Sequence, residues 1–122
     1  MRVAVVSGDF LKDVPSGADA YLLKAVIHDW DDARAVAILG NCRKVITPSS
    51  KLLIVERVVP EKAKQGQAVD AYLLDLEMLV NTPGGRERTA AEFSSILAAT
   101  GFSVTRIVPT ITPVSVIEAR PL

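Results

Sequence analysis

The hydrophobic positions along this chain alternate between short, nearly continuous apolar runs and stretches with a helical repeat. Residues 21–27 form an apolar run interrupted only by Lys24, and residues 52–58 form a second. Runs of this length are too short to span a membrane and are typical of strands covered on both faces. Between them, apolar residues recur at helical spacing over 35–46, which predicts a helix, and Asp31 and Asp32 supply a cap at its N-terminus. The strand, helix, strand order predicts a right-handed crossover between two parallel neighbouring strands.

The last third of the chain has the clearest helix and strand signals. Thr89 and Glu92 match the capping box that begins a helix, and Gly101 stands where such a helix is expected to end. Residues 102–109 and 113–119 are two strand-like runs joined by a connection short enough for an antiparallel hairpin. The chain is therefore expected to close its sheet with a hairpin.

Three further segments complete the predicted order of elements. Residues 3–7 form a short β-branched run that predicts a strand, and residues 60–67 are polar enough to form a surface loop. Residues 71–80 carry apolar side chains on most sides, which predicts a largely covered helix. Gly40 lies inside the helix predicted over 35–46 and is expected to pack closely against the sheet, because glycine in a helix otherwise costs about 1 kcal/mol relative to alanine.

A glycine-rich phosphate loop is missing from these residues. Doubly wound nucleotide folds open with a strand, a glycine-rich turn and a helix, whereas Gly84 and Gly85 fall between two predicted helices and indicate a turn. Without the first strands of such a fold, the strand predicted over 21–27 lacks a neighbour and exposes an apolar edge through which copies of the chain could self-associate. We therefore expect residues 1–122 to form a single, partial domain.

The composition of the chain is that of a single globular domain, with 122 residues of which 49% are hydrophobic and 23% charged. Fourteen basic residues balance fourteen acidic ones, so no net field favours nucleic acid or an anionic membrane surface. The single cysteine, Cys42, is predicted to be a small buried thiol in a helix rather than a nucleophile, and a reducing cytoplasm is the expected location. Small molecules or proteins are the expected partners.

Polar residues that can do chemistry follow both predicted parallel strands. His28, the only histidine, comes directly after the first strand, and Glu56 lies near the end of the second. Ligands of open α/β sheets bind at the carboxyl ends of strands, and neighbouring strands are about 4.8 Å apart, so the two side chains could touch. A neutral histidine oriented by a carboxylate can act as a general base toward a hydroxyl. From spacing alone, the alternative that His28 merely satisfies a loop and Glu56 begins a solvated turn is equally supported.

Several short motifs occur along the chain in the order found in one enzyme family. They are Gly-Asp-Phe at 8–10, Val-Pro at 14–15, Lys-Ala-Val-Ile-His-Asp-Trp at 24–30, Val-Glu-Arg at 55–57, Asp-Leu-Glu-Met-Leu at 75–79, Gly-Gly-Arg-Glu-Arg-Thr at 84–89 and Glu-Phe at 92–93. Each motif is weak by itself, but the ordered set covers essentially the whole chain. The sequence resembles the S-adenosylmethionine-dependent small-molecule O-methyltransferases, the group that includes plant caffeic acid and bacterial polyketide O-methyltransferases.

The resemblance implies roles for matching residues around the methyl acceptor. His28 resembles the base that takes the proton from the acceptor hydroxyl, and Glu56 and Glu87 resemble the two acids that flank it. Met78 is similar to a methionine that lines the acceptor pocket, although a helical methionine is more often simple core. The acceptor is then a small molecule with a hydroxyl group, expected to be phenolic.

The resemblance also implies a cofactor side of the site. Asp9 and Phe10 are similar to the pair that reads the adenine, with Phe10 in place of a methionine often found there. Lys24 resembles a lysine that contacts the cofactor. Trp30 resembles an aromatic residue that lines the adenine pocket, with a core tryptophan as the alternative. The family's N-terminal dimerisation domain, its glycine-rich loop and its ribose-binding acid have no counterpart in these residues.

The predicted fold is the C-terminal portion of an α/β, Rossmann-like methyltransferase sheet, mainly parallel with an antiparallel terminal hairpin. The predicted chemistry is methyl transfer from S-adenosylmethionine without a metal, and full-length relatives are expected to be homodimers. Two rivals remain. One is a truncated, non-catalytic remnant or interaction module of the same family; the other is a generic α/β nucleotide-binding or phosphoacceptor domain, which leaves His28, Glu56 and Glu87 without a role.

Overall fold

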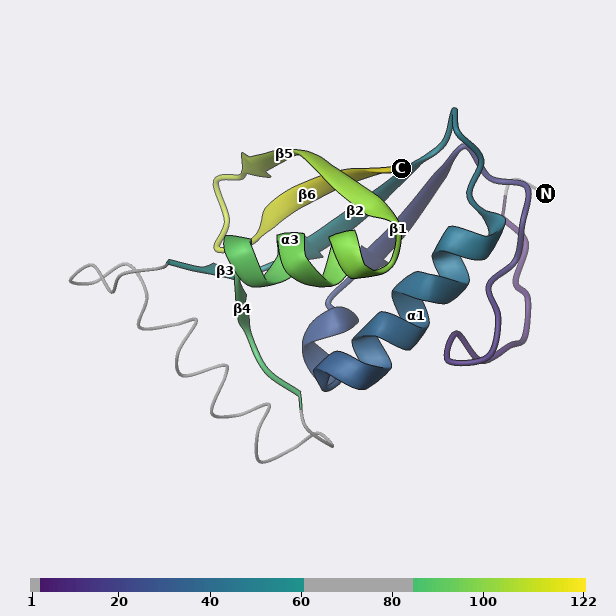
Figure 1. The fold of residues 1–122 in the computed structure, drawn as a ribbon, viewed down its shortest axis with the longest axis horizontal. Helices are drawn as coiled ribbons and strands as arrows, with labels where there is room; N and C mark the ends of the chain where they lie inside the picture. The colour runs from purple at the N-terminus through teal and green to yellow at the C-terminus, as the bar shows by residue number, and fades with distance from the viewer. Residues whose placement is uncertain (1–2, 61–84) are drawn as a thin grey trace.

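A computed structural model describes residues 3–60 and 85–122 and shows a mixed sheet with helices packed against it (Figure 1). The larger sheet has the strand order β1 (Ala20–Lys24), β2 (Lys51–Glu56), β6 (Ser115–Pro121) and β5 (Phe102–Pro109). A smaller sheet pairs β3 (Val58–Val59) with β4 (Arg88–Thr89). Strands and helices alternate as the sequence predicts, and the α/β fold class is confirmed.

The parallel pairing of β1 with β2 is confirmed, with Tyr21 opposite Leu52. β1 is the edge strand of the described sheet, and its residues alternate between exposed and half-buried. The expectation that this strand is covered on both faces is therefore wrong for the described part of the chain, and Leu22, 61% exposed, marks its open face. The expected exposed apolar edge is present, while self-association through it stays a prediction.

The closing hairpin of β5 and β6 is antiparallel, as predicted, and β6 also pairs antiparallel with β2. Of the four pairings between described strands, two are parallel and two antiparallel, because β6 returns between β2 and β5. This return places Ile117 opposite Ile54 and Ala119 opposite Leu52. All four side chains are fully buried, so β6 completes the centre of the core.

Two helices, α1 (Asp32–Val45) and α3 (Ala90–Ala99), lie on the same side of the sheet and contact each other (Figure 1). Their buried side chains join those of the strands in one hydrophobic core. The helix residues in this core are Ala35, Ile38, Leu39, Cys42, Phe93 and Leu97. The helices thus cover one side of the sheet and pack against its strands.

Both helices begin at caps that the sequence predicts. The Asp31 side chain accepts the backbone N–H of Arg34 at 2.9 Å at the start of α1. Thr89 and Glu92 form the capping box at the start of α3. α3 ends before Gly101, whose φ of +88° is a backbone conformation that glycine adopts readily.

The chain turns sharply after β1. Ala25 has a φ of +55°, a left-handed conformation that costs a residue with a side chain about 1–2 kcal/mol, and its N–H donates to the Val55 carbonyl at 3.1 Å. The 3₁₀ turn Ile27–Asp29 follows. The strand predicted over 21–27 is therefore shorter than expected, and His28 lies on a turn rather than at the strand end itself.

Two other expectations are wrong for the described residues. Residues 3–7 form no strand, and their valines are strongly exposed. Gly40 does not pack closely, since a Cβ placed on it would meet no described atom within 4 Å. The helix predicted over 71–80 and all but the first residue of the loop predicted over 60–67 lie outside the described residues.

Cys42 is the small buried thiol that the helix pattern predicts. It is 1% exposed, and burial raises the pKa of its thiol to about 11, so the thiol stays protonated and inert at neutral pH. The cytoplasmic location stays a prediction.

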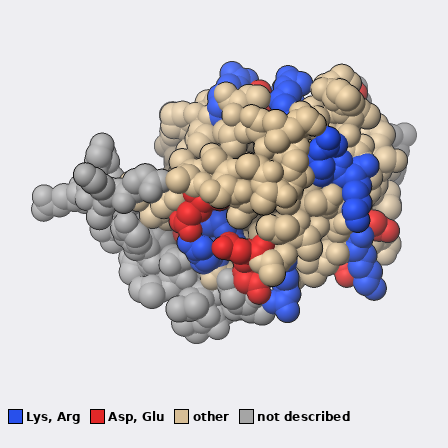
Figure 2. All heavy atoms as spheres, in the orientation of Figure 1, with Lys and Arg blue, Asp and Glu red and all other residues tan. Residues whose placement is uncertain are grey.

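None of the helices in the described ranges has the length and apolar character that a membrane crossing requires. On the face seen in Figure 2, acidic and basic side chains lie together in small groups, and uncharged surface separates one group from the next.

Candidate active site

The pairing of β3 with β4 brings together two acids from distant parts of the sequence. Glu56 is the last residue of β2, two positions before β3, and Glu87 directly precedes β4. Val58 lies opposite Arg88 in this parallel pair, so the segments that carry the two glutamates run side by side. Both glutamate side chains are 1% exposed. A short pairing in the smaller sheet thus sets the position of two buried carboxylates.

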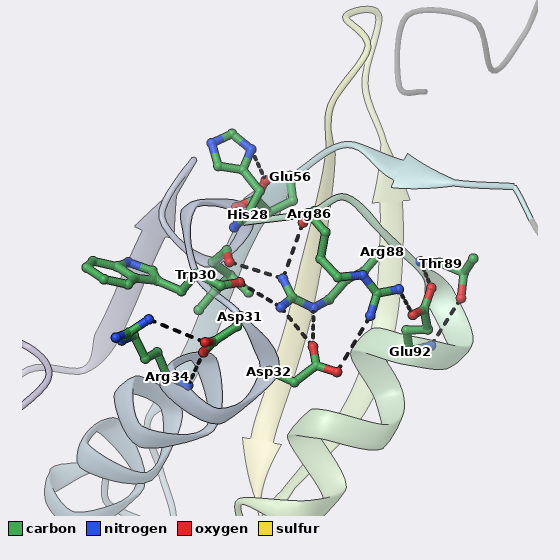
Figure 3. A network of polar contacts seen from close by, with 11 residues as sticks. His28, Trp30, Asp31, Asp32, Arg34, Glu56, Arg86, Arg88, Thr89 and Glu92 are labelled. Atoms are coloured by element: carbon green, nitrogen blue, oxygen red, sulfur yellow. Dashed lines mark hydrogen bonds and ion pairs between the residues drawn. The ribbon is translucent and has the colours of Figure 1, made fainter. Parts of the chain in front are cut away.

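His28 reaches these acids from the turn after β1, and Figure 3 shows its side chain beside Glu56. Its Nδ1 lies 3.1 Å from Glu56 Oε2 and 3.1 Å from Glu87 Oε1. Its backbone N–H donates to Glu56 Oε1 at 3.2 Å, so Glu56 holds both the ring and the main chain of the histidine. The other ring nitrogen, Nε2, is 3.4 Å from Asp29 Oδ1. The structure therefore brings together the three residues expected to be the base and its flanking acids, and their catalytic roles stay predictions.

The two carboxylates favour the protonated form of the ring. Hydrogen bonding to Glu56, and then to Glu87, raises the pKa of His28 from 6.5 to about 10, although burial opposes the shift. At neutral pH the resting ring is therefore an imidazolium between two carboxylates. Spacing alone places one acid beside this ring rather than two, and therefore predicts a neutral ring. As a base, the ring must first lose the proton that this environment stabilises.

His28, Glu56 and Glu87 also form a group that could hold a metal ion. Each offers one ligand atom, and these atoms lie within 4.8 Å of one another. Imidazole nitrogen and carboxylate oxygen are ligands of zinc and of several other divalent metals. A metal bound at Nδ1 would displace the proton that the same carboxylates stabilise, so proton and metal compete at neutral pH. That the chemistry needs no metal stays a prediction.

Sequence reasoning missed two buried residues that hold this part of the fold. Arg88, 1% exposed, donates to backbone carbonyls on either side of His28 (Figure 3). Asn41, 7% exposed on α1, donates from Nδ2 to the Phe10 carbonyl at 2.9 Å. These contacts join segments far apart in the chain, so no local pattern reveals them. One local signal could have indicated Arg88. It directly follows Glu87, and successive side chains of an extended segment point to opposite sides.

The residues expected to read the adenine line a separate cavity of about 650 Å³. Asp9 and Phe10 contribute to its wall together with Tyr21 and Leu22 of β1. Asp9 Oδ1 accepts the N–H of Leu11 at 3.0 Å, which shapes a turn in the loop. The cavity size falls within the usual range for small-ligand sites. It offers a carboxylate for hydrogen bonding and aromatic side chains against which a flat ring can pack.

Two other predicted binding residues, Trp30 and Lys24, do not line this cavity. Trp30 packs edge-on against Phe10, with ring centroids 6.0 Å apart and planes at 88°, so it supports the cavity wall from behind. Neither Trp30 nor Lys24, which is exposed at the end of β1, is among the described residues that line the cavity. Met78 lies outside the described residues. The binding roles of Asp9 and of these residues stay predictions.

The sequence is similar to known methyltransferases over nearly its whole length. A family model described as an O-methyltransferase domain matches residues 1–103. The phenazine O-methyltransferase PhzM of Lysobacter antibioticus is 46% identical over 121 residues, which are 99% of this chain and 34% of that protein. The O-demethylpuromycin-O-methyltransferase of Streptomyces alboniger is 44% identical over 123 residues, 99% of this chain and 32% of that protein. The chain spans about a third of the length of these relatives.

Solved structures show the same likeness in three dimensions. The crystal structure of LaPhzM matches with a TM-score of 0.89 at 46% identity, covering 96% of this chain and 34% of that one. The O-methyltransferase NcsB1 from neocarzinostatin biosynthesis, solved with S-adenosylmethionine and 2-hydroxy-5-methyl naphthoic acid, matches with a TM-score of 0.82 at 38% identity. That match covers 96% of this chain and 33% of NcsB1.

Proposed function

The chain belongs to the O-methyltransferase domain family, and from this premise we propose that it supplies the acceptor side of an S-adenosylmethionine-dependent O-methyltransferase. The proposed reaction transfers a methyl group to a hydroxyl, expected to be phenolic, of a small molecule. The observation that carries the proposal is His28 Nδ1, held 3.1 Å from each of two buried glutamates. NcsB1, which binds a hydroxylated naphthoic acid, supports an aromatic acceptor. Homodimer formation and a cytoplasmic location belong to the same proposal.

The cofactor cavity fits one side of the proposed cofactor. When bound, S-adenosylmethionine supplies an electrophilic methyl group that leaves its sulfonium with the bonding electron pair remaining on sulfur. Asp9 would accept a hydrogen bond from the adenosine part, and Phe10 would pack against its flat ring. Both residues line a cavity of about 650 Å³. No glycine-rich loop occurs in the sequence to bring backbone against the rest of the cofactor.

The protein's task on the acceptor side is to align the hydroxyl oxygen and remove its proton. Glu56 and Glu87 occupy Nδ1 of His28, so Nε2 is the nitrogen that would face the acceptor. As the oxygen bonds to the methyl carbon, its proton passes to Nε2 of the neutral ring. The two glutamates then stabilise the imidazolium that forms. Asp29, close to Nε2 but 45% exposed, can move aside to admit the acceptor.

The raised pKa of His28 suits a phenolic acceptor. The ring titrates at about 10 and a phenol ionises at about pH 10, so the proton passes between them at little cost in free energy. The same pKa leaves only a small fraction of the ring neutral at pH 7. The rate of methyl transfer is therefore expected to rise as the pH approaches 10.

The test is methyl transfer by a chimera in which residues 1–122 replace the matching third of the Lysobacter protein. We expect His28→Ala to lower turnover roughly 10²- to 10⁴-fold at pH 7, the usual contribution of a positioned base, with cofactor affinity nearly unchanged. Raising the pH should partly rescue this variant, because a phenol then ionises without a base. Lys44→Ala, exposed on α1, is the control and should leave turnover unchanged.

Two results would oppose the proposal. Turnover of the His28→Ala chimera within about threefold of its parent would remove the base assignment. A parent chimera that binds S-adenosylmethionine but transfers no methyl group would favour the rival hypothesis of a non-catalytic remnant.

A further inference from the structure

We propose that Arg88 is a positioning residue that holds the turn carrying His28, so that two successive residues, Glu87 and Arg88, fix the ring and the backbone of the same histidine. The inference rests on the proposed function, because it assigns a role within the same site. It is carried by a set of hydrogen bonds that converge on the two ends of one short turn.

The contacts of Arg88 bracket His28 along the chain. Nη1 donates to the carbonyl of Ile27, the residue before His28, at 3.0 Å. Nη2 donates to the carbonyl of Trp30, two residues after it, at 2.9 Å. Figure 3 shows the guanidinium lying against this turn, with Asp32 at its other side. The turn cannot shift relative to β4 without breaking at least one of these bonds.

The third partner of Arg88 balances its charge. Nε and Nη2 donate to Asp32 Oδ1 at 3.1 and 2.9 Å, so the fork reaches the first residue of α1 as well as the turn. The arginine side chain is fully buried, and a buried cation is stable only when its donors are satisfied. A planar fork with five N–H donors meets this demand, whereas a lysine ammonium cannot reach both carbonyls and the carboxylate.

Strand geometry explains why adjacent residues serve one histidine. Successive side chains of an extended segment point to opposite sides. Glu87 therefore reaches the His28 ring while Arg88 extends to the backbone on the other side of the same segment. Trp30, whose carbonyl Arg88 holds, packs against Phe10 of the cofactor cavity, so the same arginine also joins the two sides of the site.

Arg86 provides a matched control two positions away. It contacts the same aspartate, with Nη1 3.5 Å from Asp32 Oδ2, and also pairs with Glu92. Its side chain is 40% exposed, and its ion pairs within the described residues go to Asp32 and Glu92 rather than to the turn. A variant of Arg86 thus changes the local charge and the Asp32 pairing while leaving the bonds to Ile27 and Trp30 in place.

The experiment is an NMR pH titration of the 122-residue chain, in which His28 is the only histidine. We expect Arg88→Lys to lower the titration midpoint of His28 by about one pH unit or more, because a loosened turn weakens the hydrogen bonds to Glu56 and Glu87 that raise it. Loss of the Arg88 charge by itself would raise the midpoint. Lysine keeps the positive charge. A lower His28 midpoint in Arg88→Lys therefore indicates that the turn has shifted, not that a charge has been lost.

The controls separate positioning from charge. Arg86→Lys should leave the midpoint within about 0.3 pH units of wild type, since it touches neither the ring nor the turn. A folded Arg88→Lys chain with an unchanged midpoint would overturn the inference. A midpoint that rises in Arg88→Met and stays constant in Arg88→Lys would show that Arg88 acts through its charge alone. Fluorescence of Trp30, the only tryptophan, reports whether each variant keeps the fold.

A measurement on the wild-type chain decides the matter if the Arg88 variants unfold. We expect the guanidinium protons of Arg88 to give separate resonances that exchange with water more slowly than those of Arg86. Fast exchange of the Arg88 guanidinium protons with water would show that this side chain is not held by the turn, and would overturn the inference. Neither measurement depends on turnover, so the proposed methyl transfer can fail while this inference stands, and the reverse.

Discussion

The two sides of the candidate site differ in how completely this chain builds them. The acceptor corner, defined as His28, Glu56, Glu87 and Arg88, has its acids and its arginine buried and its groups joined by hydrogen bonds of about 3 Å. The cofactor cavity is walled largely by an exposed loop over 6–16 and by the edge strand β1. The acceptor corner is therefore held by buried hydrogen-bonded groups, whereas the described wall of the cofactor cavity is formed mainly by exposed segments.

Cofactor affinity of the 122-residue chain should show the largest effect of this difference. We expect S-adenosylmethionine to bind with a Kd above about 1 mM, because these residues include no glycine-rich loop and few contacts then offset the free-energy cost of ordering the ligand. Isothermal titration calorimetry measures it, with the chimera as the control. Micromolar affinity of the isolated chain would erase the contrast between the two sides.

Removing one acid should disturb the acceptor corner next most strongly. Breaking a buried charge pair by deleting one partner costs roughly 3–5 kcal/mol, and Glu56→Gln should fall toward the lower end because an amide keeps a hydrogen bond. Glu56→Gln should also lower the pKa of His28 more than Glu87→Gln, since the Glu56 hydrogen bond is the largest cause of the shift. Urea unfolding and NMR titration check both, with Lys44→Ala, exposed on α1 and outside the site, as the control. Equal shifts would contradict the ranking of the two acids.

The stability of the chain should depend on the pH through His28. Its pKa is about 10 in the folded chain and 6.5 in the absence of these contacts, so the folded state binds the proton more tightly. This stabilisation is fully present below pH 6.5 and is lost as the pH rises from 6.5 through about 10, amounting to a few kcal/mol. Urea midpoints across this range measure it. A His28→Asn chain should lose this dependence, and an equally steep dependence in that chain would assign it to other groups.

The loop that walls the cofactor cavity should respond more weakly to loss of its anchor. Asn41→Ala removes the hydrogen bond to the Phe10 carbonyl, and the expected loss of stability is about 1 kcal/mol, typical of one such bond. Amide exchange near Phe10 should accelerate while exchange around His28 stays unchanged. A similar acceleration at both sites would show that the two sides form one cooperative unit.

Gly40→Ala should have the smallest effect, and it should be stabilising. A Cβ at this position meets no described atom within 4 Å, so helix propensity acts alone and favours alanine by about 0.5–1 kcal/mol. Thermal unfolding measures the gain. A loss of stability would contradict this prediction and would indicate that other residues cover α1 at Gly40.

The sequence predicted those features that depend on neighbouring residues. The capping box at Thr89, the cap at Asp31 and the glycine after α3 are local patterns, and the structure contains all three. The strand predicted over 21–27 is too long, because its apolar run continues through the left-handed Ala25 into the turn that carries His28. Hydrophobic runs mark what can be buried, not where a backbone changes direction.

The family, the order β1, α1, β2, the closing helix and hairpin, and the candidate residues His28, Glu56 and Glu87 thus follow from the sequence alone. The protonation of His28 and the role proposed for Arg88 do not, because each depends on side chains brought together from segments 28 to 61 residues apart. Electrostatic energies rise steeply as charged groups approach and leave water, so the same residues have different pKa values when they are apart. Only the pairing of β3 with β4 and the turn after β1 set those distances, and they place the His28 ring between two buried acids that favour its protonated form.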